Sequence, residues 1–244
     1  YLGTKFKRER VLSERDMKIL FDLFQHKVCD LNGIYQNHFS GKDSTTCEKA
    51  LTQLVKHKLI SKRSYYSERK LTRYFHLTTK GLEEIKKKLT FDTIRNEIKS
   101  DKVEHDLTLY KIFNRLKKVE YFFDLKTENL IQSRHFPEDE EIAPFRTLNS
   151  DLYLALKSDS EIYRFAIEFE RRIKYRKRWE KSDGIFYICE DLLLYHYLKK
   201  VLLEIDQGFI SKFSIITKTN FLVNESVIFE NPYGKKFILN IQSG

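Results

Sequence analysis

The net charge of this chain is confined to its first 99 residues. Residues 1–99 contain 22 Lys and Arg against 12 Asp and Glu, whereas residues 100–244 contain 23 of each kind. The first segment therefore carries a net charge of +10, and the second carries none. A strongly basic segment attracts polyanions through electrostatic steering and counterion release. We therefore expect the 244 residues to form two units, with nucleic-acid binding in the first.

The composition limits the classes of protein to which the chain can belong. The most apolar segment, residues 185–205, is interrupted by five charged residues and is not expected to cross a membrane. The first residues show neither an initiator Met nor a signal-peptide hydrophobic region, so secretion is not indicated. The three cysteines, at positions 29, 47 and 189, lack the paired spacing of a zinc site or a disulfide framework. We expect a cytoplasmic protein with reduced thiols and no membrane partner.

Three helices are predicted near the start of the chain. The first is expected at residues 13–24, where apolar residues at helical spacing follow a Ser cap and an acidic first turn. The second is expected at residues 31–39, before a Ser-Gly-Lys-Asp breaker. The third is expected at residues 45–58, where Thr45 and Glu48 have the spacing of a capping box. All three show one apolar face, as helices packed on a common core do.

A hairpin and a further helix are predicted to follow. Two β-prone runs, at residues 59–66 and 71–77, flank a charged tip at residues 67–70. A helix is expected at residues 82–89, with a run of three lysines near its end. This gives three helices, a basic hairpin and a fourth helix.

That succession, with the phrase Tyr-Phe-His-Leu-Thr-Thr-Lys-Gly at residues 74–81, resembles the winged helix-turn-helix domains of prokaryotic regulators. In that family the third helix enters the major groove of DNA and the hairpin, or wing, touches the backbone or the minor groove. The resemblance gives the groove role to the polar side chains opposite the apolar face of the third helix, which are Thr45, Thr46, Lys49, Thr52, Gln53 and Lys56. It gives the wing role to Arg63, Arg69, Lys70 and Arg73.

The chemistry of these side chains supports the same interpretation. Short polar groups can read base edges, and Lys and Arg neutralise phosphates without specifying sequence. The alternative is that they only solvate a surface, or that this winged helix binds a protein. The charge asymmetry favours DNA.

A polar segment divides the chain. We expect a winged helix-turn-helix in residues 1–91, a linker in residues 92–106 and an α/β domain in residues 107–244. The expected elements of that last domain are a helix at 107–116, strands at 119–123, 152–157, 163–169 and 184–189, a helix at 191–205 buried against a sheet or a second subunit, and strands at 212–223 and 226–239.

Three carboxylates in the second half have the arrangement of a metal site. Asp151 begins one β-prone run, and Glu168 and Glu170 lie on one face of the next, because strand side chains repeat every two residues. Such a trio can hold Mg²⁺ or Mn²⁺ against a phosphodiester so that water attacks in line. The succession resembles the core of the PD-(D/E)XK nuclease superfamily, except that Glu170 takes the place of the usual Lys. Arg172, in the basic run that follows, is the nearest substitute cation.

The alternative is that Glu168 and Glu170 pair with neighbouring Arg side chains in an ordinary charged network. The nuclease-like fold then persists as a scaffold or a dimerisation platform.

More narrowly, the chain resembles the bacterial replication-relaxation family of plasmid and mobile-element proteins. The features that carry this resemblance are the winged helix, the phrase His-Asp-Leu at residues 105–107, a strand with Asp151, the phrase Ala-Ile-Glu-Phe-Glu-Arg at residues 166–171, and a following helix that leads to Tyr187. The resemblance implies a DNA-associated protein of plasmid replication, mobilisation or regulation. It implies plasmid replication or relaxation proteins as partners.

The sequence thus predicts an α+β protein, with an N-terminal winged helix-turn-helix followed by an α/β restriction-endonuclease-like domain. The predicted function is sequence-preferring binding of double-stranded DNA by a homodimer with an inactive nuclease-like domain, and DNA binding needs no cofactor. One alternative is a Mg²⁺- or Mn²⁺-dependent endonuclease or nickase that uses Asp151, Glu168 and Glu170. The other is a winged-helix transcriptional repressor.

Overall fold

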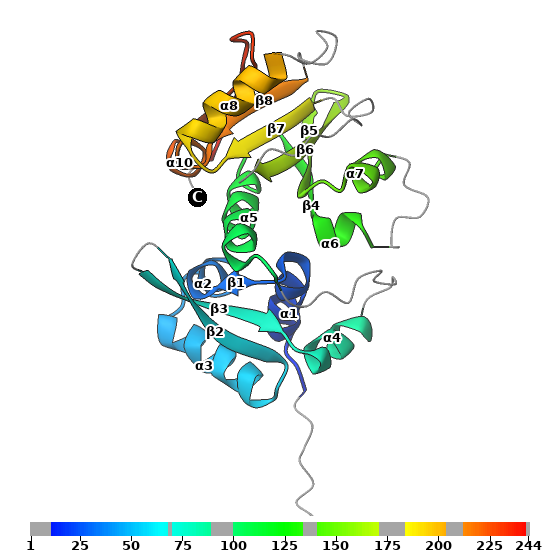
Figure 1. Cartoon of the computed structure of the whole chain (residues 1–244). Coiled ribbons are helices and arrows are strands. Elements are labelled where there is room, and N and C mark those ends of the chain that lie inside the picture. Colours follow the sequence, from blue (N-terminus) through cyan, green and yellow to red (C-terminus); the bar gives the residue numbers. More distant parts are fainter. Residues whose placement is uncertain are drawn as a thin grey trace, which may run out of the picture.

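The computed structural model describes residues 11–67, 70–88, 100–133, 141–170, 184–203 and 212–242. The fold is a mixture of helices and sheets (Figure 1), so the predicted α+β class is confirmed. The side chains of Ser67, Lys70, Leu148 and Glu170 lie outside this description. Residues 11–88 and residues 100–242 are called here the N-terminal unit and the sheet unit.

The N-terminal unit packs its helices on a small antiparallel sheet. Its helices are α1 (Glu14–His26), α2 (Leu31–His38), α3 (Ser44–Lys56) and α4 (Thr79–Lys86). Its strands are β1 (Cys29–Asp30), β2 (Ile60–Ser67) and β3 (Lys70–Leu77), in the order β1-β3-β2. The three predicted helices and the predicted hairpin are therefore confirmed. Ser13 caps α1 as predicted, in a capping box with Asp16.

Two helix starts in this unit differ from the prediction. The N-cap of α3 is Asp43, whose carboxylate accepts hydrogen bonds from the Thr45 backbone N–H at 3.1 Å and the Thr45 hydroxyl at 2.8 Å. The predicted capping box of Thr45 with Glu48 is therefore wrong, because Asp43 satisfies the same free N–H groups one residue before the helix. Helix α4 begins three residues earlier than predicted, since the Thr78 hydroxyl accepts from the Gly81 backbone N–H at 3.1 Å.

The sheet unit surrounds one large twisted sheet. Its described strands run in the order β10-β9-β8-β7-β6-β5-β4, where β6, β7 and β8 are parallel and the other neighbours are antiparallel. The strands are β4 (Phe122–Thr127), β5 (Leu152–Ser158), β6 (Glu161–Glu170), β7 (Gly184–Cys189), β8 (Phe213–Thr217), β9 (Ser226–Glu230) and β10 (Lys236–Asn240). The helices are α5 (Val103–Leu116), α6 (Glu128–Ile131), α7 (Ala143–Leu148), α8 (Leu192–Leu203) and α10 (Lys218–Val223).

Most of the predicted elements of this unit are found, and three are displaced. The strand predicted at residues 119–123 lies instead at 122–127, and Val119 makes only an isolated bridge to Ile241. The strand predicted at residues 212–223 ends at Thr217, whose hydroxyl caps α10 by accepting from the Asn220 backbone N–H. Helix α5 begins at Val103, so the last four residues of the predicted linker are helical.

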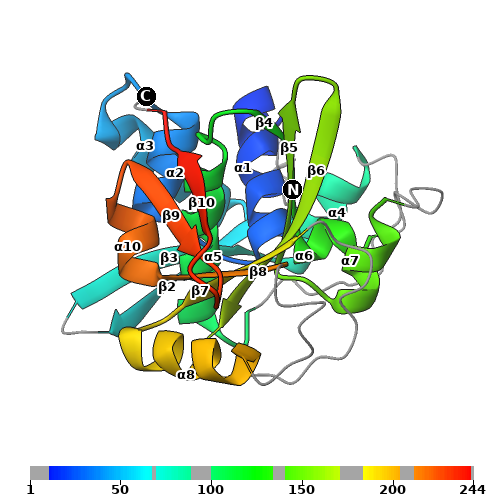
Figure 2. The ribbon, with the colours of Figure 1, turned by 90° about the horizontal axis from the view of Figure 1, so that it is seen from above.

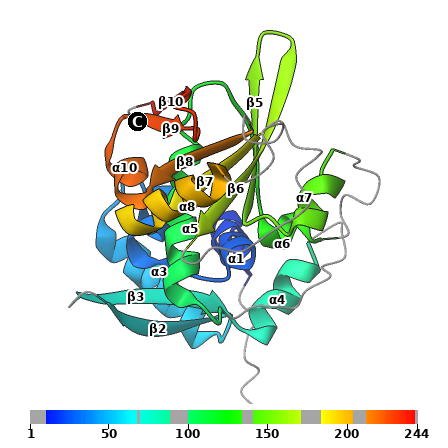
Figure 3. The same ribbon diagram turned by 45° about the horizontal axis from the view of Figure 1, so that its top comes forward.

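Both faces of the sheet are covered by helices (Figures 2 and 3). One face packs on α5 and α10 through an apolar core that includes Phe113 and Phe221. The other face packs on α7 and α8 through a second core that includes Phe145 and Leu202. Helix α8, predicted to be buried against a sheet or a second subunit, packs one side on the sheet, while Leu193 on its outer side is 82 % exposed in the single chain.

Helix α5 joins the two units. Ile112, Phe113 and Leu116 pack in the core of the sheet unit, whereas Tyr110 is wholly buried in the core of the N-terminal unit. The approach of the two helices is close, since a Cβ on Gly33 of α2 would stand 2.3 Å from the Tyr110 ring. Helix α5 therefore contributes side chains to the cores of both units.

Candidate functional site

The residues predicted to read DNA form the outer surface of α3. Its inner face buries Cys47, Ala50, Leu51 and Leu54 in the core of the N-terminal unit. The side chains on the other side are exposed or, for Thr46, half-buried; they are Thr45, Thr46, Lys49, Thr52, Gln53 and Lys56. The apolar spacing of the helix dictates this orientation, because residues three and four apart share a face.

Two of these hydroxyl groups donate hydrogen bonds within the chain. The Thr45 hydroxyl donates to the Asp43 carboxylate at 2.8 Å, and the Thr52 hydroxyl donates to the Glu48 carbonyl oxygen at 2.7 Å. Their oxygens retain lone pairs and can still accept a hydrogen bond from a base. Gln53 offers both a donor and an acceptor, and Lys49 and Lys56 offer positive charge.

The β2–β3 hairpin extends beside this helix. Arg63 on β2 and Arg73 on β3 are both exposed, and Arg63 is paired across the hairpin with Tyr74. The Arg73 guanidinium lies 3.9 Å from the Glu48 carboxylate of α3, so this part of the hairpin lies beside the helix. Arg69 and the side chain of Lys70 lie outside the described residues.

A groove of about 730 Å³ runs between α3, the hairpin and α5. Glu48 lines it from α3, Arg73 lines it from β3 and Lys111 lines it from α5. From the sequence, Glu48 was predicted only to cap α3, and no role was predicted for Lys111. Lys111 follows directly after Tyr110, so its position beside the N-terminal unit became visible only once α5 was seen to dock there.

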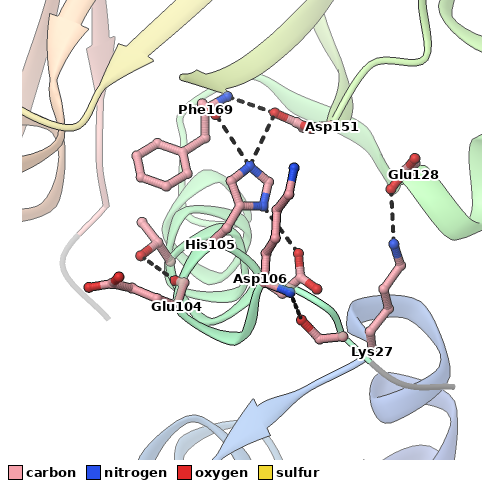
Figure 4. Close-up of polar contacts among 10 residues, drawn as sticks. Lys27, Glu104, His105, Asp106, Glu128, Asp151 and Phe169 are labelled. Atoms are coloured by element: carbon pink, nitrogen blue, oxygen red, sulfur yellow. Dashed lines mark hydrogen bonds and ion pairs between the residues drawn. The ribbon is translucent and has the colours of Figure 1, made fainter. Parts of the chain in front are cut away.

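The predicted carboxylate site lies at the end of the β5–β6 hairpin. Leu152 pairs with Ile167, so Asp151 and Glu168 each stand one residue beyond this pair. Asp151 accepts a hydrogen bond from the Phe169 backbone N–H at 2.9 Å (Figure 4). Glu168 is only 1 % exposed. The structure therefore brings these two residues to one end of the hairpin and commits one oxygen of Asp151 to the backbone.

His105 of α5 lies against this carboxylate (Figure 4). Its Nε2 atom is 3.9 Å from an Asp151 carboxylate oxygen and 3.3 Å from the Phe169 carbonyl oxygen, while its Nδ1 atom is 3.1 Å from the Asp106 carboxylate. Burial by itself lowers the pKa of His105, but the hydrogen bond with Asp106 and the charge of Asp151 outweigh it and raise this pKa. The imidazole is thus held between two carboxylates that favour its protonated form.

The residues that the structure describes do not assemble the predicted metal centre. Within the described ranges, no three His, Cys, Asp or Glu side chains are grouped so that they could hold a metal ion. The side chain of Glu170 and the whole of Arg172 lie outside those ranges. His105 lies beside Asp151 together with the Phe169 backbone. In the sequence, His105 stands out only as part of a motif.

We expect His105→Gln to remove a part of the stability that depends on pH. Because the pKa of His105 is raised in the folded state, its contribution is fully present below about pH 6.5 and is lost as the pH rises through the folded-state pKa. Urea unfolding of both proteins between about pH 5.5 and about pH 9 measures this. The difference in unfolding free energy should shrink as the pH rises, and a constant difference contradicts the assignment.

No helix in the described part of the chain is long and apolar enough to cross a membrane. The three cysteines are buried and form no disulfide. No family model, curated protein or solved structure matches the chain.

Proposed function

We propose that the chain binds double-stranded DNA with sequence preference through a winged helix-turn-helix in its N-terminal unit. In this proposal α3 is the reading helix and the β2–β3 hairpin is the wing. One observation carries it: the exposed polar face of α3 stands beside an arginine-bearing hairpin in the half of the chain that holds all the net positive charge. Such a surface is the electrostatic footprint of a nucleic-acid-binding protein.

The side chains divide by their chemistry into two roles. Lys49, Lys56, Arg63 and Arg73 are exposed cations, and they contact phosphates and fix the position of the duplex. Gln53 presents an amide that can pair with the N6 and N7 groups of adenine in the major groove. Affinity therefore depends mainly on the cations, and sequence preference depends on the polar side chains between them.

The sheet unit acts in this proposal as a platform that holds the reading surface and supports dimerisation. Two observations support the role of a platform. Helix α5 packs into the core of the N-terminal unit, and a backbone hydrogen bond occupies one oxygen of Asp151. The DNA that we propose the chain binds belongs to plasmid replication, mobilisation or regulation, as the resemblance to replication-relaxation proteins implies. Comparing the affinities for two DNA segments distinguishes the possible roles. Tighter binding to the chain's own promoter indicates regulation, and tighter binding to an origin indicates a role in replication.

A double substitution on α3 tests the reading surface. We expect Lys49→Ala with Lys56→Ala to lower the salt slope of DNA binding by about 2, because each lost phosphate contact contributes about 0.9. Relative to about 1 M salt, where the electrostatic contribution vanishes, the same arithmetic gives an affinity loss of about 60-fold at about 0.1 M salt. Fluorescence anisotropy with a labelled duplex measures both quantities.

The matched control is Lys235→Ala with Lys236→Ala, which removes the same charge from the exposed start of β10 in the sheet unit. A small loss is expected there. Equal losses in both double variants point to general charge attraction, and an unchanged affinity in the α3 variant shows that α3 does not contact the duplex.

Incubation with supercoiled plasmid separates the platform from the rival nuclease. We expect retardation on a gel, with no nicking or linearisation in Mg²⁺, Mn²⁺ or EDTA, because Asp151 is engaged by Phe169 and His105. Metal-dependent cleavage that Glu168→Ala abolishes, while DNA binding persists, establishes the nuclease instead.

A further inference from the structure

An exposed apolar pair lies near the tip of the β2–β3 hairpin. Tyr66 on β2 and Leu71 on β3 stand directly opposite each other in the antiparallel register. Their side chains are 68 % and 60 % exposed. The outer end of the hairpin projects beyond α2 and α3 (Figure 1). A pair this exposed, at the end of a projecting hairpin, buries little apolar surface within the chain, so packing does not account for it.

The alternation of side chains along β3 places this pair on the side of α3. Residues two apart on a strand share a face of the sheet. Phe75 is buried in the core that α3 also enters, and the Arg73 guanidinium lies 3.9 Å from the Glu48 carboxylate of α3. Leu71 continues this series outward and lines the groove together with Arg73 and Glu48. Tyr66, opposite Leu71, is therefore on the face of the hairpin that turns toward the proposed reading helix.

The opposite face of the hairpin is covered by the chain itself. Tyr74 is buried in a cluster with Val28 and Leu107 of α5, and Tyr65 packs against this cluster. The neighbouring side chains Tyr65 and Tyr66 thus differ, since Tyr65 is half-buried beside α5 and Tyr66 is exposed. The exposed apolar pair of the described hairpin faces α3.

The charges around the pair select its partner. Residues 60–77 contain five Lys or Arg against one Glu, which gives a net charge of +4. The groove beside the pair adds Lys111, and the two acids that line it are engaged, because Asp30 caps α2 and Glu48 faces Arg73. A second copy docked on this face would bring like charges together. The minor groove of duplex DNA offers phosphates on both sides of an apolar wall of sugars, so it suits both the cations and the apolar pair.

We propose that Tyr66 and Leu71 form an apolar wedge that enters the minor groove of duplex DNA, partly unstacks one base step and bends the duplex. This inference rests on the proposed DNA binding and adds a mechanism to it. The cations bind phosphates, while the wedge adds apolar contact and deforms the DNA. Because TA and CA steps unstack most easily, the wedge contributes sequence preference where no side chain forms a hydrogen bond with a base.

Replacing both apolar side chains with serine tests the wedge. Tyr66→Ser with Leu71→Ser should lower the affinity for duplex DNA about 10-fold, because burial of apolar surface against the DNA is lost. The salt slope should not change, because neither side chain carries a charge. The matched control is Tyr233→Ser with Leu193→Ser, which removes an exposed Tyr and an exposed Leu from the sheet unit and should bind as the wild type does. Fluorescence anisotropy at several salt concentrations measures both quantities.

The bend gives a second readout, which uses the wild-type chain. A set of DNA fragments of equal length carries the bound segment from the chain's own genetic neighbourhood either at the centre or at one end. A bend of about 20° or more should make the complex with the central segment migrate more slowly in a gel. The serine variant should remove this difference in mobility.

The outcomes separate this inference from the proposed function. Salt-dependent binding by the wild-type chain without a bend, or an affinity that the serine substitutions leave unchanged, overturns the wedge and leaves the proposed DNA binding in place. The absence of any binding by the wild-type chain at the lowest salt overturns both.

Discussion

Replacing Tyr110 with Ala is expected to lower the free energy of unfolding by about 4 kcal/mol, since removal of a large buried aromatic ring leaves a cavity. The ring is wholly buried in the core of the N-terminal unit, although its helix, α5, continues into the sheet unit. Its hydroxyl accepts a hydrogen bond from the Asn37 side chain of α2 at 3.0 Å. Tyr110→Ala should therefore destabilise both the N-terminal unit and its contact with α5.

Denaturant unfolding followed by circular dichroism measures this loss. Tyr233→Ala is the control, because this side chain is 55 % exposed on a turn and its removal should cost less than about 0.5 kcal/mol. Tyr110→Phe removes only the hydroxyl and should cost about 1 kcal/mol. A loss below about 1 kcal/mol for Tyr110→Ala shows that α5 does not hold the two units together.

Acidification to about pH 4.5 is expected to lower the stability of the wild-type chain through His26 by about 2.5 kcal/mol. Burial between aromatic rings lowers the pKa of His26 from 6.5 to about 4, against the opposing charge of Asp22. The neutral form is thus favoured in the folded state. Its contribution is complete above about pH 6.5 and is lost as the pH falls toward 4.

His26→Gln removes this titration and keeps a polar side chain at the end of α1. The variant should lose less stability than the wild type between about pH 7 and about pH 4.5, as measured by urea unfolding at both values. His196→Gln, on the exposed side of α8, is the control and should follow the wild type. Parallel losses in the wild type and His26→Gln contradict a buried neutral His26.

Elements of the fold were predictable where they depend on residues that are close together in the sequence. Ser13 with an acidic first turn begins α1, and apolar spacing sets the inner face of α3. The N-cap of α3 was harder to predict, because Asp43 and Thr45 both suit an N-cap and only one residue separates them. The helix at Lys218–Val223 was missed, because it follows β8 directly and its start depends on a single hydroxyl, that of Thr217.

The contacts between the two units and the surroundings of Asp151 were not predictable from the sequence. His105 lies 64 positions from Phe169, and Asn129 lies 105 positions from Phe24, so periodicity carries no information on either contact. The sequence placed Asp151 and Glu168 at neighbouring strand ends, which the antiparallel register of β5 and β6 confirms. It did not reveal that α5 would bring His105 between Asp106 and Asp151.

The central claim is that the N-terminal unit binds duplex DNA through phosphate contacts around α3. The direct test is a titration of labelled duplex, taken from the chain's own genetic neighbourhood, with the full chain at salt concentrations from about 0.05 to about 0.3 M. If the four exposed cations Lys49, Lys56, Arg63 and Arg73 each contact a phosphate, the logarithm of the association constant falls linearly with the logarithm of salt, with a slope of about −4. No binding at the lowest salt, or binding that does not change with salt, contradicts the account.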